Sequence, residues 1–116
     1  MGNVKPDILT EYQEQCLLVQ YLEAKKIKFS KIAQETFTRD WGTKMKNKLS
    51  GLRPGLPDML IILPKKLLFI EMKRTKGGSV KPDQKEWIEE LNKIDNVYAF
   101  VAKGYEEAKK IIESLC

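Results

Sequence analysis

The hydrophobic positions of the chain follow helical spacing in three segments. Apolar residues recur every three or four positions over 11–25, behind a capping box that Thr10 and Gln13 would form. A second amphipathic segment begins at Pro82, a residue that suits the first turn of a helix, and a third runs from Tyr105 onward. We therefore expect three helices.

Short apolar runs of strand length lie between these helices. They cover 27–34, Met59–Leu63, 67–70 and 97–102. The two central runs flank the turn Pro64-Lys65-Lys66, so we expect a hairpin whose two strands are both buried. The resulting order, α-β-β-β-α-β-α, predicts an α/β fold with a mixed sheet covered by helices, in one domain over 1–116.

Two further expectations concern the segment 38–54 and the tryptophan at position 87. The segment 38–54 is polar, basic and punctuated by glycine, which predicts an exposed loop or a short helix. Trp87 shares helical spacing with Leu91 and Ile94, and we expect it in the core.

The charge of the chain favours a polyanionic partner. The formal net charge is +5 and the pI about 9.2. The segment 25–53 holds nine Lys and Arg against two Asp and Glu, a formal +7. No apolar stretch reaches the length of a membrane span, so we expect a cytoplasmic protein without a membrane partner.

The absence of histidine excludes several kinds of chemistry. A Ser-His-Asp or Cys-His nucleophile and a His-ligated zinc site all need an imidazole, and the chain has none. Its two cysteines are too few for a zinc cluster and suit a reducing compartment. Catalysis would therefore use carboxylates, Lys, Tyr or a bound metal ion.

The candidate chemistry lies where charges flank the two most apolar strands. Asp58 precedes one strand, and Glu71 and Lys73 end the next on a shared face. A hairpin would bring all three to one end of the sheet. Paired carboxylates suit Mg²⁺ or Mn²⁺, and a neighbouring lysine could orient a water for phosphodiester hydrolysis. The alternative is that these are ordinary charged strand ends that reach solvent.

These residues also carry a family resemblance. Gly55-Leu56-Pro57-Asp58, Glu71-Met72-Lys73 and a helix opened by 79–84 together resemble the VRR-NUC branch of the PD-(D/E)XK nucleases, with their restriction-endonuclease-like core. The resemblance implies that Asp58, Glu71 and the carbonyl oxygen of Met72 bind the metal ion. It also implies that Lys73 positions the attacking water and that Gln84 supports the site.

The contribution of the first helix is less defined. The family uses a Glu there, and Glu11, Glu14 and Gln15 lie within one turn. We favour Glu11 and Gln15, which share a face by their spacing. Alternatively, Glu11 is a first-turn acid that complements the helix dipole.

Basic residues before and after the motifs are candidates for DNA binding. A solvated loop is the alternative for the segment before Asp58, in which Trp41 could stack on a base or pack the loop. The candidates for phosphate contact are Lys44, Lys46, Lys48, Arg53, Arg74 and Lys76.

The sequence thus predicts a Mg²⁺-dependent DNA endonuclease, with Mn²⁺ as a substitute. Because so small a chain lacks a helix-turn-helix or zinc module, we expect it to recognise branched DNA, such as Holliday junctions or flaps. The resemblance implies a homodimer and a phage origin, hence the host cytoplasm. The alternatives are a non-cleaving DNA-binding module with the same fold, or an RNA or nucleotide hydrolase.

Overall fold

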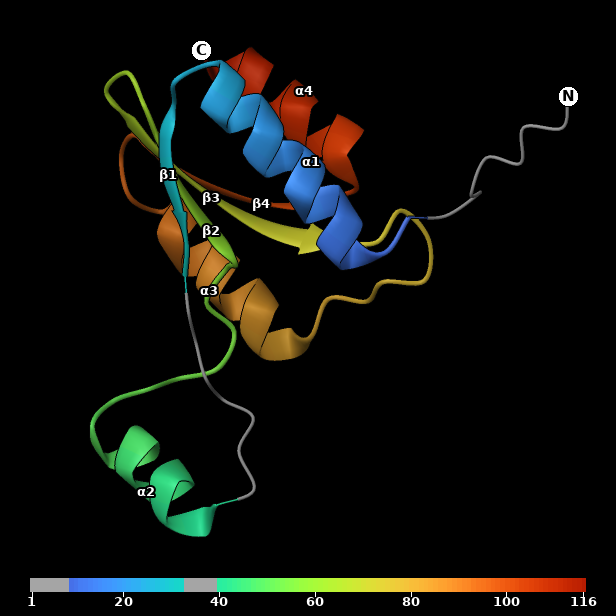
Figure 1. Cartoon of the computed structure of the whole chain (residues 1–116). Coiled ribbons are helices and arrows are strands. Elements are labelled where there is room, and N and C mark those ends of the chain that lie inside the picture. The colour runs from blue at the N-terminus through green and yellow to red at the C-terminus, as the bar shows by residue number, and fades with distance from the viewer. Residues whose placement is uncertain (1–8, 33–39) are drawn as a thin grey trace, which may run out of the picture.

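A four-stranded sheet forms the centre of the computed structural model, which describes residues 9–32 and 40–116 (Figure 1). The elements in chain order are α1 (Glu11–Ala24), β1 (Lys28–Lys31), α2 (Trp41–Leu49), β2 (Met59–Leu63), β3 (Lys66–Lys73), α3 (Pro82–Asn92), β4 (Val97–Lys103) and α4 (Tyr105–Leu115). The predicted order is confirmed, with α2 as an added short helix where the sequence allowed a loop or a helix. Residues 33–34 of the predicted first strand and 38–39 of the basic segment lie outside the described residues.

The sheet is mixed, and its register brings the ends of three strands together. The strands lie in the order β1-β2-β3-β4, with β1 and β3 antiparallel to β2 and with β4 parallel to β3. Met59 pairs with Lys31 on one side and with Ile70 on the other. The end of β1, the start of β2 and the end of β3 therefore share one end of the sheet, as the predicted hairpin requires.

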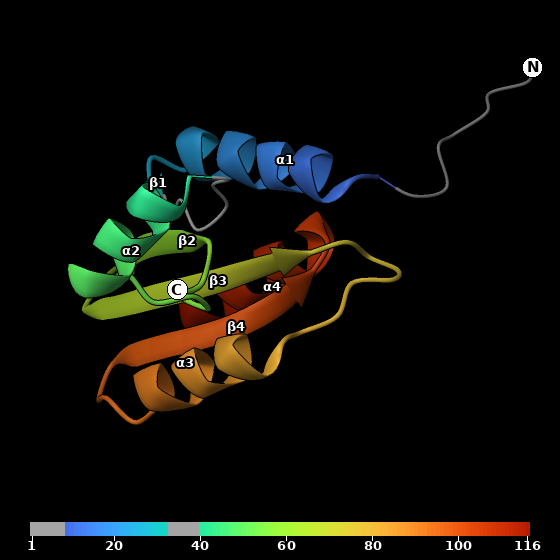
Figure 2. The ribbon, with the colours of Figure 1, turned by 90° about the horizontal axis from the view of Figure 1, so that it is seen from below.

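Helices α1 and α4 cover one face of the sheet, and α3 lies on the other beside β4 (Figures 1 and 2). Alternating strand residues pack against α1 and α4, as expected for a sheet with one well-covered face. This core consists of Leu18, Leu22, Met59, Ile61, Leu63, Leu68, Ile70, Met72, Ala102, Ala108 and Ile112.

Two expectations about burial are wrong. Ile62 on the outer face of β2 is 49% exposed. Among the described residues, α3 covers the β4 side of that face and no helix packs over its β1–β2 side. Trp87 is half-buried and outside the core, since it faces the loop before Asp58, where its indole N–H donates to the carbonyl of Pro54 at 3.0 Å.

The helix boundaries follow the capping chemistry of the sequence. The predicted capping box at the start of α1 is present: the Thr10 hydroxyl accepts from the amide of Gln13, whose side chain accepts from the amide of Thr10. At the start of α3 the Gln84 side chain accepts from the amide of Lys81. In the described part of the chain, no helix has the length and apolar character that crossing a membrane requires.

Candidate active site

Three carboxylates converge at the end of the sheet where β2 begins. Glu11 comes from the first turn of α1, Asp58 directly precedes β2, and Glu71 lies near the end of β3. One carboxylate oxygen from each lies within 4.8 Å of the others. We call Glu11, Asp58 and Glu71 the acidic cluster.

The loop that precedes Asp58 is fixed against α3. Gly55 has φ +102°, and a Cβ at this position would lie 2.8 Å from the backbone of Asp83 and 3.0 Å from the Trp87 ring. Glycine is therefore required both by the backbone angle and by the close approach. At the other end of the loop, the Asp58 side chain accepts from the amide of Met72 at 3.1 Å, which fixes Asp58 beside the end of β3.

Glu71 is the buried member of the cluster, with 3% of its surface exposed. The Lys73 ammonium lies 3.2 Å from its Oε2, and the Gln84 amide donates to the same oxygen at 3.1 Å. Because Gln84 also accepts from the amide of Lys81, its side chain is held at both ends. Neither the lysine nor the glutamine contact uses Oε1 of Glu71.

Burial and mutual repulsion perturb the carboxylates. The pKa of Glu71 is raised to about 7, first by burial and then by Asp58 and Glu11, against the opposing effect of Lys73. Burial also raises the pKa of Asp58, although the Met72 amide, Lys73 and Lys31 oppose that rise. Negative charge on this cluster is therefore under-compensated by the protein itself.

These properties fit a small divalent cation. Carboxylate oxygens are the ligands that Mg²⁺ and Mn²⁺ prefer, and a cation among three of them would offset their repulsion. Lys73 lowers the pKa of Glu71, but burial and the charges of Asp58 and Glu11 outweigh it and raise that pKa to about 7.

The structure separates the three candidates on α1. Glu11 joins the acidic cluster. The Gln15 amide instead donates to the sulfur of Met59 at 3.7 Å, and Gln15 borders a hollow that also touches Asp58. Glu14 is buried away from the cluster, where its carboxylate accepts from the amide of Tyr105 and the hydroxyl of Thr75, each at 2.8 Å.

Glu14 thus caps α4, a role that sequence reasoning missed. Gly104, the N-cap residue of α4, has no side chain to satisfy the free amides. Its positive φ of +91° suits glycine, and an added Cβ would lie 2.7 Å from the Thr75 hydroxyl. A glycine at a helix start was the available signal, but it does not say which acid supplies the cap.

Two further basic residues border the acidic cluster and were also missed. Lys31 at the end of β1 and Lys81 before α3 line a polar hollow of about 280 Å³ together with Asp58, Glu71 and Gln84. Both are exposed lysines among many in the sequence, so no local pattern distinguishes them.

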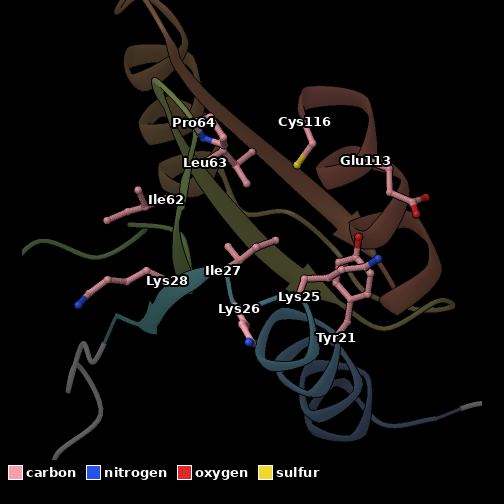
Figure 3. A pocket seen from close by; sticks show the side chains of 10 residues that line it. All are labelled: Tyr21, Lys25, Lys26, Ile27, Lys28, Ile62, Leu63, Pro64, Glu113 and Cys116. Atoms are coloured by element: carbon pink, nitrogen blue, oxygen red, sulfur yellow. The ribbon is translucent and has the colours of Figure 1, made fainter.

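Another hollow, of about 670 Å³, lies at the opposite end of the sheet (Figure 3). It is formed by the end of α1, the start of β1, the β2–β3 turn and the end of α4, and its lining includes Tyr21, Leu63 and Cys116. No member of the acidic cluster lines it. This hollow is therefore not the candidate active site, despite its volume.

The predicted DNA-binding residues fall in two places. Lys44, Lys46 and Lys48 are exposed on α2, which has no buried residue and stands away from the sheet (Figure 1). Arg53 donates to the carbonyls of Lys48 and Leu52, so it supports the end of α2. Arg74 and Lys76 are exposed in the loop after β3. Both places connect to the end of the sheet that carries the acidic cluster.

Comparison with known proteins decides the family. The family model described as the VRR-NUC domain matches residues 3–106. The chain belongs to the VRR-NUC family. A VRR-NUC domain implies a nuclease-type fold, with DNA as substrate and, as is general for nuclease domains, use of divalent metal ions.

Solved structures agree with this assignment. One, titled a VRR_NUC domain protein, is 26% identical over 95% of this chain and 93% of its own, with a TM-score of 0.75. A second, titled a VRR_NUC domain, is 24% identical over 90% of this chain and 97% of its own, with a TM-score of 0.65, and shares the fold. Among curated proteins, none matches the chain.

Proposed function

We propose that this VRR-NUC domain, as a single unit over 1–116, is an endonuclease that hydrolyses phosphodiester bonds in DNA with Mg²⁺, or with Mn²⁺ as a substitute. The observation that carries this proposal is the convergence of Glu11, Asp58 and Glu71 within 4.8 Å, beside the ammonium of Lys73. Three carboxylates on the edge of a basic protein would repel a phosphate on their own. They support hydrolysis only if a cation joins them.

The acidic cluster holds the metal ion in this proposal. Asp58 and Glu71 are direct ligands, the carbonyl oxygen of Met72 adds a third, and Glu11 contributes from α1. A bound divalent cation stabilises negative charge on the phosphate and lowers the pKa of a water. The hydrogen bond from the Met72 amide fixes Asp58, and Gln84 fixes Glu71, so the ligands are oriented before an ion arrives.

Lys73 is proposed to orient the attacking water. Its side chain is 14% exposed and its ammonium has two further N–H groups beyond the one directed at Glu71. One of these can donate to a water oxygen or to a phosphate oxygen as charge develops. Gln84 acts through Glu71, and Gln15 borders the site from α1 beside Asp58.

Basic residues on both sides of the cluster are proposed to hold the DNA backbone. The lysines of α2 project from one connection, and Arg74 and Lys76 from another, at the same end of the sheet. Phosphate contacts of this kind position a nucleic acid without reading its bases. The net charge of +5 supports this assignment.

We further propose that DNA shape, rather than base sequence, selects the substrate. The described residues form the sheet, its three packing helices and the basic α2, which leaves little surface for reading base edges. Branched DNA, a Holliday junction or a flap, is the proposed substrate class. A pair of copies would bring two clusters to two strands of such a branch.

A cleavage assay tests the proposed activity. End-labelled four-way junction, flap and linear duplex DNA, with a single-stranded RNA for comparison, are incubated with the full chain and Mg²⁺, Mn²⁺ or EDTA. We expect branched DNA to be cut in either metal ion and no substrate to be cut in EDTA. Binding of branched DNA without cleavage in any divalent ion would show a non-cleaving DNA-binding domain, and cleavage of RNA alone would refute the proposed substrate.

A further inference from the structure

A second hollow adjoins the acidic cluster on the side of α1. It has a volume of about 620 Å³ and runs between one face of α1 and the edge strand β1. Glu11 and Asp58 of the acidic cluster line it, as does Lys31. We call this hollow the α1 groove.

The lining of the α1 groove combines two kinds of residue. Glu11, Asp58 and Lys31 are charged, whereas Tyr12, Cys16 and Val19 form an apolar stripe at helical spacing along α1. Val19 packs against the core, but residue Tyr12 is 77% exposed. An aromatic ring left in water beside a groove offers a face to a planar ligand.

Lys31 and Asp58 connect this groove with the polar hollow on the other side of the cluster. Both residues line both hollows. The amide of Ile32 donates to the carbonyl of Asp58, which holds the end of β1 beside the cluster. A strand whose phosphate lies at the cluster therefore has a polar space on one side and an aromatic-walled space on the other.

We propose that the α1 groove binds one unpaired nucleotide next to the phosphate that is cut, with its base stacked on Tyr12 and its phosphate near Lys31. This inference rests on the proposed nuclease function and narrows its substrate. A base within continuous duplex is already stacked on both faces, so its rings are not available to Tyr12. The groove therefore favours DNA in which one strand leaves the duplex, a flap or a fork, over a fully paired four-way junction.

One charge at the groove suits a nucleotide. Lys31 supplies a positive charge for the phosphate, whereas Glu11 and Asp58 line the same groove and would repel a phosphate unless a cation at the acidic cluster offsets them. Stacking on an aromatic ring tolerates any base, which agrees with recognition of DNA shape. A second protein chain seated on Tyr12 is the competing occupant, and the experiment below separates the two.

The test replaces Tyr12 with Ala and with Phe in the full chain. Flap DNA carries the fluorescent base 2-aminopurine at its first unpaired position, and binding is measured in EDTA so that no strand is cut. We expect wild type to quench the probe and Tyr12→Phe to do the same. Tyr12→Ala should lose the quenching and bind the flap more weakly by roughly 5- to 150-fold, the range for loss of one base–aromatic stack.

Two comparisons make the result specific. Binding to continuous duplex should change less than about twofold in Tyr12→Ala, because phosphate contacts dominate it. Ile94→Ala removes another exposed apolar side chain, at the opposite end of the sheet, and should leave flap binding unchanged. Melting curves should show all variants folded, since Tyr12 is largely exposed.

The outcomes distinguish this inference from the proposed function. Unchanged quenching and unchanged flap cleavage by Tyr12→Ala would overturn the groove assignment and leave the nuclease standing. Loss of a dimer in Tyr12→Ala by sedimentation, with flap binding intact, would also overturn it and assign the groove to a protein partner. Quenching by wild type without cleavage in any divalent ion would refute the nuclease and keep the base-binding groove.

Discussion

Replacing Glu71 with glutamine should change how the stability of the metal-free protein depends on pH. The pKa of Glu71 is raised in the folded state, so the folded protein holds this proton more tightly than the unfolded chain does. The stabilisation from this proton is complete below the ordinary pKa of 4.5 and is lost as the pH rises through about 7. A glutamine carries no titrating proton and removes this loss.

The size of the effect follows from the raised pKa. A rise from 4.5 to about 7 corresponds to about 3 kcal/mol, at roughly 1.4 kcal/mol per pH unit. In Glu71→Gln the side-chain oxygen can still accept from Gln84, but Lys73 loses its ionic partner. In wild type this ion pair forms only where Glu71 is ionised, and its effect is already contained in the pKa of about 7, because Lys73 lowers that pKa. The informative quantity is therefore the change with pH of the difference in unfolding free energy between Glu71→Gln and wild type.

Urea unfolding in EDTA between pH 4.5 and 8 measures this quantity. Fluorescence of the half-buried Trp87 reports unfolding, since its indole packs on the loop before Asp58. We expect the free energy of unfolding of Glu71→Gln, relative to wild type, to rise by about 3 kcal/mol across this range. A difference that is independent of pH would refute the argument that the buried carboxylate is under-compensated.

The same titration with Mg²⁺ adds a control. A cation at the acidic cluster should stabilise wild type most at high pH, where Glu71 is ionised, and should have little effect on Glu71→Gln. Equal stabilisation of both proteins by Mg²⁺ would mean that the ion binds elsewhere.

Three further changes test the structure around the site. Glu14→Gln should destabilise the protein by about 1–3 kcal/mol in urea unfolding, because the amide of Tyr105 and the hydroxyl of Thr75 lose a carboxylate acceptor. The pH effect of Glu71 should remain in this variant. Gly55→Ala should lower stability by at least ~1–3 kcal/mol in the same assay, since its positive φ and the contact with Asp83 both oppose a Cβ; a gain in stability would show that the loop is not fixed on α3. Replacing the three lysines of α2 with Ala should weaken binding to every DNA shape and reduce the slope of log K against log salt by roughly 0.9 per lost phosphate contact, whereas parallel slopes would place the DNA elsewhere.

The alternation of apolar residues was enough to predict most of the fold. The hairpin between β2 and β3 follows from two apolar runs and a short turn, and its register then places Asp58 near Glu71. The periodicity of α1, α3 and α4 is equally plain in the sequence. These features depend on local spacing, which a single sequence contains.

The two wrong predictions concern side chains whose burial depends on long-range packing. Trp87 has the spacing of a core residue, but its contact is with Pro54, which is 33 positions earlier. Ile62 is exposed because α3 lies toward β4, a matter of helix placement that periodicity does not report. Both depend on which surfaces meet after folding.

The candidate site shows the same division. The motif predicted Asp58, Glu71 and Lys73 as neighbours, and Gln84 came from the family resemblance; the structure brings all four together. Spacing favoured Glu11 and Gln15 over Glu14 but could not establish the choice, because Glu11 and Glu14 are both acids of the first turn of α1. Only the tertiary contact of Glu14 with α4 distinguishes them.

The proposed metal-dependent cleavage is tested by single-turnover cleavage of branched DNA by wild type, Asp58→Ala and Lys73→Ala, with binding to the same DNA measured in parallel. We expect cleavage by wild type in Mg²⁺ or Mn²⁺ and none in EDTA. We also expect both variants to bind within a few-fold of wild type without cutting, because phosphate contacts elsewhere carry most of the affinity. Cleavage by Asp58→Ala at the wild-type rate, or undiminished cleavage in EDTA, would contradict this proposal.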